Sequence, residues 1–385
     1  MAARLGLLAL ADLLVFPLRM LPLGLRSLAH RAHRADLCEH GLEVYRGGAT
    51  DGPLVLYVHG GSWGQGSPWQ YALLTKPLLA AGASAVAIVK YRLFPEAEVD
   101  EMLADVQRAL EWARAQPGTP RVVLAGQSAG AHLCALLLAR VSCTAAACPE
   151  AARQPPAWLP DRFVSLSAPL DILAHFRHET TRGVHWASPM WLAMIGRRPS
   201  GRADDGCGGG GRGGEERAEA AVLALVLERL GASDSGAGRT LLESPGAAER
   251  CGLDEASLLD AAEVAGGTSR RGEWSVRELA ALALASPARL LRLQNELVGA
   301  GQPPVAWPPT AVIHAADDLT VPVSSGRDFA KAAGGAVQWR EYQSGGHAGV
   351  VLALMSRTRL DSHPPELARM AADFVRWAAL REAVE

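Results

Sequence analysis

The sequence predicts an α/β fold in which helices cover both faces of a mostly parallel central sheet. Strand-like runs alternate with longer segments of helical periodicity along most of the chain, and this alternation is typical of a parallel sheet. Near residue 128 one strand-like run leads directly into a helix-forming run. The chain, with 385 residues of which 49% are hydrophobic, can bury the large core that such a sheet needs.

The expected strands are short apolar or alternating runs. They fall at residues 42–45, 54–58, 84–89, 121–125, 163–167, 310–314 and 337–342. The expected helices lie between them, and the clearest has apolar residues at helical spacing from Val99 to Leu110. These helices are 71–81, 96–115, a segment that begins after Ser128, and 365–385 with Leu367, Met370, Phe374 and Trp377 on one face.

The junction near residue 128 carries the pentapeptide Gly126-Gln127-Ser128-Ala129-Gly130, which fits the pattern G-x-S-x-G. A strand before this pattern and a helix after it make a nucleophile elbow, a strained turn that exposes the serine hydroxyl. The two glycines let the strand and the helix approach closely. A second match at residues 60–64 also follows a strand but precedes a loop, so the sequence favours Ser128 as the nucleophile.

The second match is better explained as a partner of the elbow. His59-Gly60-Gly61 directly follows the strand at 54–58 and matches the HGG type of oxyanion loop. Acyl transfer places negative charge on a carbonyl oxygen, and backbone N–H groups can meet that charge without reorganising. The predicted donors are the amides of Gly60, Gly61 and Ala129, the residue after the nucleophile.

Two C-terminal loops supply a carboxylate and a histidine in the chain order Ser…Asp…His. Asp317 and Asp318 follow the strand at 310–314, and the pattern H-x-x-x-D-x-x-V-P aligns on Asp318, which is therefore the predicted acid. His347 lies on a glycine-rich loop after the last strand and is the predicted general base for Ser128. Together these residues predict a serine hydrolase.

Several stretches resemble one family of α/β hydrolases. They are residues 59–63, 91–95, 101–105, 126–132, 170–176, 182–189 and 314–322. The chain resembles the esterase–lipase group and, more narrowly, the isoprenylcysteine methylesterase-like branch. That resemblance implies an α/β-hydrolase fold and removal of the methyl ester from prenylated C-terminal cysteines. It also implies a membrane protein of the endoplasmic reticulum or Golgi.

The expected function is therefore hydrolysis of a carboxylic ester by a Ser-His-Asp triad, on a small-molecule or lipidated-cysteine ester. An arylformamidase that cleaves an N-formylkynurenine-type amide, and a general carboxylesterase or lipase, are alternatives with the same machinery. A membrane-tethered hydrolase fold without catalysis is the alternative outside the enzymes. Ser-His-Asp chemistry requires no cofactor and no metal.

Composition and the other reactive residues limit the function further. The formal net charge of −2 and the lack of a basic, aromatic-laced stretch give no reason to expect nucleic acid as a partner. The six cysteines have neither C-x-x-C spacing nor zinc-finger spacing, and reduced, mostly buried thiols are expected. His314 ends a strand and His132 follows the elbow, so packing or supporting roles are expected for both.

The N-terminal residues 1–34 form an apolar segment outside the alternation of strands and helices. Asp12, Pro17, Arg19 and Pro22 interrupt it, so its uncharged stretches are too short for one unbroken membrane-spanning helix. Membrane association is favoured, helped by Arg26, Arg31 and Arg34 at lipid headgroups. A cleaved organelle-targeting segment and a helix that covers the core are the alternatives.

The predicted hydrolase domain comprises residues 35–197 and 286–385. Residues 198–285 are predicted to be an insertion on the side of the sheet where a lid would lie. Its first part, 200–216, is a glycine-rich tract with too little apolar surface to order itself. The insertion is either a spacer, which the sequence favours, or a lid or substrate wall.

Overall fold

The computed structural model describes most of the predicted hydrolase domain. The described residues are 23, 25–31, 35–37, 41–118, 121–147, 155–184, 188–195, 225–228, 230, 235–242, 244, 247–251, 276–299, 304–356 and 359–380. The predictions for residues 1–22, for Arg34 and for the tract 200–216 lie outside the described residues.

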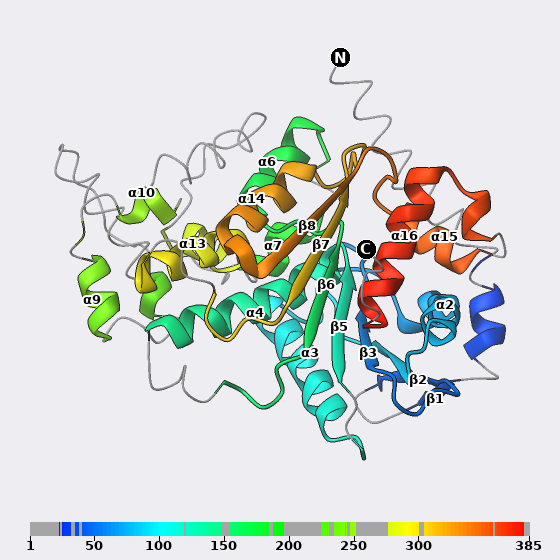
Figure 1. Ribbon diagram of the computed structural model, residues 1–385. Coiled ribbons are helices and arrows are strands. Elements are labelled where there is room, and N and C mark those ends of the chain that lie inside the picture. Colours follow the sequence, from blue (N-terminus) through cyan, green and yellow to red (C-terminus); the bar gives the residue numbers. More distant parts are fainter. Residues whose placement is uncertain are drawn as a thin grey trace.

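The central sheet has eight strands in the order β1-β2-β4-β3-β5-β6-β7-β8 (Figure 1). Strands β3 to β8 pair in parallel, while β1 and β2 pair antiparallel at one edge. The predicted α/β-hydrolase fold with a mostly parallel sheet is confirmed. The strands are β1 Ala35–Leu37, β2 Glu43–Arg46, β3 Leu54–Val58, β4 Ala85–Val89, β5 Val122–Gln127, β6 Arg162–Leu166, β7 Thr310–Ala315 and β8 Val337–Tyr342.

Helices cover both faces of this sheet, because neighbouring residues of a strand point to opposite sides. On β3, Leu54 and Leu56 enter one buried cluster and Val55 and Tyr57 enter another. The first cluster is formed with α3 Val99–Arg114, α4 Ala129–Ala147, α6 Ile172–Thr181, α7 Met190–Ile195, α9 Gly236–Leu242, α10 Ala247–Cys251, α12 Val276–Leu284, α13 Pro287–Val298 and α14 Val323–Ala333. The second is formed with η2 Pro68–Leu74, α2 Thr75–Ala80, α15 Gly349–Met355 and α16 Pro365–Ala378.

Helix α4 follows the elbow and is the central helix of the first cluster. It is apolar almost throughout and, by length and composition, is the one described helix that could cross a membrane. Most of its apolar residues are buried inside the domain, where α13 packs along it. The composition of α4 is therefore that of a core helix.

The predicted helix at 71–81 differs from the structure in its first half. The chain forms the 3₁₀ helix η2 first and then α2. Pro77 has no amide hydrogen, so it cannot donate the α-helical bond back to Leu73, and a continuous α-helix through both segments loses a bond there.

Two described segments bear on the predicted domain limits. Residues 25–31 are helical and pack on the edge of the domain, where the Arg31 guanidinium lies 2.7 Å from a Glu43 carboxylate oxygen. At the end of the predicted insertion, α12 contacts α6, α7 and α13, and the residues Ala280 to Ala285 are buried.

Candidate active site

Ser128 lies at the turn between β5 and α4, at the carboxyl end of a parallel strand. Its φ of +53° falls in the left-handed region, which costs a non-glycine residue about 1–3 kcal/mol. The turn is held by a bond from the Ser128 amide to the Leu166 carbonyl at 2.9 Å and one from the His132 amide to the Ser128 carbonyl at 2.9 Å. The predicted strand–turn–helix junction is thus present around Ser128.

The two glycines of the elbow are required by close backbone contacts. A Cβ atom on Gly126 would lie 2.7 Å from the Ala131 nitrogen, and one on Gly130 would lie 2.2 Å from the Val58 carbonyl oxygen. Any side chain at either position would push the helix away from the strands. The second contact is with the end of β3, so Gly130 also sets the distance between the elbow and the loop after β3.

Ser128, His347 and Asp318 form one hydrogen-bonded chain, although they lie on three separate loops. His347 Nε2 is 2.9 Å from Ser128 Oγ, and His347 Nδ1 is 2.9 Å from Asp318 Oδ2. The ionised carboxylate can only accept, so Nδ1 carries the hydrogen and Nε2 presents its lone pair to the serine hydroxyl. Asp318 is almost fully buried, whereas the His347 side chain is 19% exposed. This is the geometry of a base that can remove the serine proton.

The Asp318 carboxylate is held ionised by four donors. Its Oδ1 accepts the amides of Thr320 and Val321, each at 2.9 Å, while His347 and His314 contact Oδ2. Burial alone would raise the pKa of Asp318. The charge interaction with His347, together with the hydrogen bonds from both histidines, instead holds this pKa well below its usual value.

His314 supports the carboxylate rather than the serine. It is fully buried, and its Nε2 lies 3.1 Å from the Val321 carbonyl oxygen and 3.3 Å from Asp318 Oδ2. Both neighbours accept, so Nε2 carries the hydrogen and divides it between them. His314 thus connects the start of the loop that carries Asp318 with the end of that loop. This agrees with the supporting role expected from its place on the strand.

The neighbouring Asp317 contacts the other loop of the triad. Its Oδ1 accepts the amides of Gly345 and Gly346 at 2.9 and 2.8 Å. These two glycines immediately precede His347, so the carboxylate of Asp317 fixes the backbone that presents the imidazole. The two adjacent aspartates therefore have different roles. Asp318 binds the side chain of His347, and Asp317 binds the backbone of the loop that carries it.

The loop after β3 places Gly60, one of the predicted oxyanion donors, beside the serine. A Cβ atom on Gly60 would lie 2.3 Å from the Gln127 side-chain oxygen and 3.1 Å from the Ser128 Cβ, so a residue without a side chain is needed this close to the nucleophile. In the described chain, no hydrogen bond uses the amides of Gly60, Gly61 or Ala129. They are available to a ligand oxygen.

Aromatic residues set the directions of those amides. Tyr91 Oη donates to the His59 carbonyl at 3.0 Å, and His59 Nδ1 lies 2.8 Å from the Gly60 carbonyl. In a trans peptide the C=O and the following N–H point in opposite directions. Anchoring the His59 carbonyl therefore aims the Gly60 amide, and anchoring the Gly60 carbonyl aims the Gly61 amide.

His59 is itself held in the neutral form. It is buried between the rings of Tyr71 and Tyr91, whose centroids lie 5.5 and 4.6 Å away. Burial lowers the pKa of His59 to about 4, against the smaller opposing effect of its bond to the Gly60 carbonyl. This residue therefore acts as a fixed structural donor and carries no charge near neutral pH.

A second buried histidine joins the oxyanion loop to α4 and α12. Trp63 Nε1 donates to His132 Nδ1 at 3.2 Å, so His132 Nε2 carries the hydrogen and donates to the Ala285 carbonyl at 2.7 Å. Burial lowers the pKa of His132 to about 3. The supporting role expected for this residue agrees with its contacts.

Gln127, the residue before the serine, reaches toward the base. Its Nε2 donates to the His347 carbonyl at 3.2 Å. The G-x-S-x-G pattern leaves this position unspecified, so the sequence offered no reason to single it out. The roles of Gln127, Tyr91 and Asp317 were all missed from the sequence, because each depends on a contact between loops far apart in the chain.

Within the described residues, no group of three or more His, Cys, Asp or Glu side chains is arranged to hold a metal ion. The described cysteines Cys134, Cys143 and Cys251 are buried free thiols. Burial raises the pKa of all three thiols, which opposes their use as nucleophiles.

Comparison with known proteins agrees with this fold. Residues 55–182 match a family model described as the alpha/beta hydrolase fold. Carboxylesterase/phospholipase LipF from Mycobacterium tuberculosis is 38% identical over 93 residues, which are 24% of this chain and 25% of that protein. Kynurenine formamidase from Danio rerio is 38% identical over 100 residues, 25% of this chain and 34% of that protein.

Isoprenylcysteine alpha-carbonyl methylesterase ICME from Arabidopsis thaliana is 37% identical over 111 residues, which are 26% of each protein. This chain thus spans a quarter to a third of the length of these curated relatives. Among solved structures, carboxyl esterase 2 from Tuber melanosporum aligns with a TM-score of 0.47 and 16% identity, covering 88% of this chain and 82% of that one.

The chain has the α/β-hydrolase fold that the sequence predicts, and residues 55–182 match the family model of that fold. This match spans β3, the oxyanion loop and the elbow. The similar proteins include a carboxylesterase/phospholipase and an isoprenylcysteine methylesterase, which agrees with the resemblance to the esterase/lipase group.

Proposed function

We propose that the protein hydrolyses carboxylic esters with Ser128 as nucleophile, His347 as general base and Asp318 as the acid that orients the base. The observation that carries this proposal is the unbroken chain of two 2.9 Å hydrogen bonds from Asp318 through His347 to Ser128. A serine on a strained turn, with a base at its hydroxyl and free backbone amides beside it, is equipped for acyl transfer.

In the first half of the reaction, His347 Nε2 takes the proton of Ser128 as the serine oxygen attacks the ester carbonyl carbon. The amides of Gly60, Gly61 and Ala129 bind the negative oxygen that forms. When the tetrahedral intermediate collapses, the bond to the alcohol oxygen breaks and His347 gives its proton to the departing alcohol. Water then attacks the acyl-serine by the same steps and releases the acid.

The direct test is a pair of serine variants, assayed with a short p-nitrophenyl ester. Ser128→Ala should lose at least about 10³-fold in kcat, because the triad residues act as a unit. Ser62→Ala, in the second G-x-S-x-G match, should keep most of the activity. Full activity in folded Ser128→Ala protein would overturn the proposal.

For the substrate, we favour a prenylcysteine methyl ester. Support comes from the partial similarity to the isoprenylcysteine methylesterase and from the branch-like stretches at 170–176 and 182–189. A comparable partial similarity to kynurenine formamidase makes amide cleavage the second candidate. Values of kcat/KM on a prenylcysteine methyl ester and on N-formylkynurenine decide between them, since the higher value identifies the preferred bond.

A prenylated substrate would place the enzyme at a membrane, and residues 1–34 would supply that position, in the endoplasmic reticulum or Golgi. A cleaved targeting segment remains the alternative. Removing residues 1–22 should reduce activity on a membrane-presented prenyl ester more than activity on a soluble ester. Equal losses on both substrates would assign the segment to the folded core.

A further inference from the structure

The loop after β3 holds two consecutive non-glycine residues in the left-handed region. Ser62 has a φ of +49° and Trp63 has a φ of +58°. Each such residue costs about 1–3 kcal/mol and persists only where its surroundings hold it in place. Gly61, a predicted oxyanion donor, lies directly before this pair, so relaxation of the pair would move the Gly61 amide. The contacts that hold Ser62 and Trp63 therefore also hold the oxyanion hole.

Trp63 provides the strongest of these contacts. Its side chain is 2% exposed, and its Nε1 donates to His132 Nδ1 at 3.2 Å. The two rings are nearly perpendicular, with their centroids 5.2 Å apart. The Trp63 carbonyl accepts the Phe94 amide at 2.9 Å. The side chain and the backbone of Trp63 are thus each fixed by a different segment of the chain.

His132 lies in the first turn of the helix that carries the third predicted oxyanion donor. Helix α4 begins at Ala129, three residues before His132. In the described structure, the bond from Trp63 to His132 is the one side-chain hydrogen bond between residues 59–66 and residues 126–133. This bond therefore joins the two segments that supply the oxyanion donors.

The carbonyl of Ala285 fixes the tautomer that this bond requires. It accepts the hydrogen of His132 Nε2 at 2.7 Å, which leaves Nδ1 as the acceptor for Trp63. Ala285 is fully buried directly after α12, and its own amide donates to the Ala281 carbonyl at 3.0 Å. Ala285 is also the last residue of the predicted insertion, so the end of that segment supports the oxyanion loop through His132.

We infer that Trp63 is a positioning residue for the oxyanion hole, held through His132 by the Ala285 carbonyl. The indole bond keeps the strained loop, and with it the Gly61 amide, at a fixed place relative to the Ala129 amide. Donors that are fixed in advance stabilise the developing oxyanion without reorganising, so the bond acts on the transition state more than on substrate binding. The inference rests on the proposed ester hydrolysis.

The first test compares two tryptophan variants of the full-length protein on a short p-nitrophenyl ester. Trp63→Phe should lower kcat about 30-fold with little change in KM, because it loosens the oxyanion donors without removing one. Trp307→Phe is the matched control and should keep the wild-type kcat. It removes an indole bond of 2.9 Å to Thr310 Oγ1 at the amino end of β7, whereas Ser128 follows the carboxyl end of β5.

The second test changes the acceptor of the indole bond. His132→Leu should lower kcat as Trp63→Phe does, whereas His132→Gln should restore kcat to near the wild-type value, since glutamine can accept from Trp63 and donate to Ala285. Amide hydrogen exchange in the peptide 59–66 should be at least about tenfold faster in Trp63→Phe and His132→Leu, and unchanged in His132→Gln and Trp307→Phe. Thermal unfolding shows that each variant is folded.

A kcat of folded Trp63→Phe equal to that of an active wild type would overturn the inference and leave the proposed function in place. Unchanged hydrogen exchange in Trp63→Phe and His132→Leu would also overturn it, because the indole bond would then not hold the loop. Equal losses of kcat in His132→Gln and His132→Leu would contradict the route through Ala285. A wild type that hydrolyses no ester would overturn the proposed function, and the inference with it.

Discussion

The two halves of the candidate site approach Ser128 by different physical means. The N-terminal half, from β3 through the elbow, presents backbone amides whose directions are set by glycines and by buried aromatic and histidine side chains. The C-terminal half presents the side chains of Asp318 and His347, which lie 2.9 Å apart, and the contacts of Asp318 with His347 and His314 hold its carboxylate ionised.

The histidines show the contrast between the two halves most clearly. His59 and His132 in the N-terminal half are buried away from carboxylates, and burial lowers the pKa of both. His347 and His314 in the C-terminal half both contact Asp318. A histidine next to a carboxylate can hold a proton during a reaction, whereas a histidine buried among aromatic rings can only donate one fixed hydrogen bond.

The largest effect is expected from the carboxylate that defines the C-terminal half. Asp318→Asn should lower kcat about 10³- to 10⁴-fold, because an amide can donate to His347 Nδ1 and favour the wrong tautomer. Asp317→Asn should lose less than about tenfold, since its amide oxygen can still accept the Gly345 and Gly346 amides. Steady-state kinetics on a soluble ester measures both, and the reverse ranking would exchange the roles of the two aspartates.

The buried histidines of the N-terminal half should appear in the pH dependence of stability. Their pKa values, about 4 for His59 and about 3 for His132, lie below the unfolded value of 6.5. Between pH 6.5 and 4 the unfolded chain binds more protons, so the free energy of unfolding should decrease as the pH falls through this range. Each histidine contributes a slope of about 1.4 kcal/mol per pH unit.

His132→Gln should flatten that decrease by about half, because glutamine can accept from Trp63 and donate to Ala285 without taking up a proton. Denaturant unfolding at pH 7, 6 and 5 provides the measurement. An unchanged slope in the variant would show that His132 is not the group that titrates. The loss of stability due to Asp318 occurs separately, below about pH 4, because its folded pKa lies under its unfolded value of 3.8.

A smaller effect is expected from the tyrosine that aims the Gly60 amide. Tyr91→Phe should lower kcat roughly tenfold with little change in KM, since it loosens one oxyanion donor without removing it. Tyr57→Phe is the matched control, because the Tyr57 hydroxyl is buried and has no hydrogen-bond partner in the described structure. Equal losses in the two variants would mean that the tyrosines act through packing alone.

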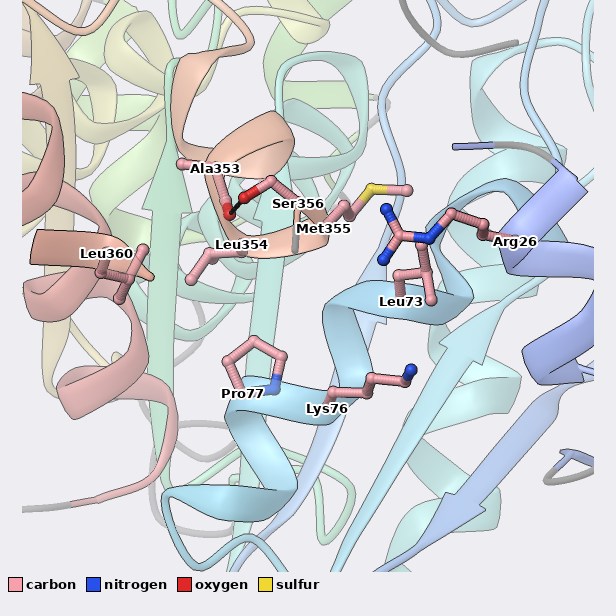
Figure 2. A pocket seen from close by; sticks show the side chains of 9 residues that line it. All are labelled: Arg26, Leu73, Lys76, Pro77, Ala353, Leu354, Met355, Ser356 and Leu360. Carbon is pink, nitrogen blue, oxygen red and sulfur yellow. Dashed lines mark hydrogen bonds between the residues drawn. The ribbon is translucent and has the colours of Figure 1, made fainter. Parts of the chain in front are cut away.

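The two halves also differ in how far the sequence could predict them. The elbow, the HGG loop and the parallel sheet are local patterns, so strand, turn and helix could be recognised before any contact was known. Asp318 could be chosen over Asp317 only by alignment to a motif. Other features join segments 28 to 50 residues apart in the chain, and no local pattern encodes them. They are the bond of Asp317 to the loop of His347, the bond of Tyr91 to His59, and a cavity beside α2 that Arg26 and Lys76 both line (Figure 2).

The central claim is that Ser128 is an activated nucleophile, and a fluorophosphonate probe tests it most directly. We expect rapid modification of the full-length protein at one position, Ser128, located by mass spectrometry of the labelled peptide. The rate should fall by orders of magnitude in His347→Gln, because the serine then lacks its base. Folded wild-type protein that stays unlabelled, or that is labelled at Ser62 instead, would contradict the account.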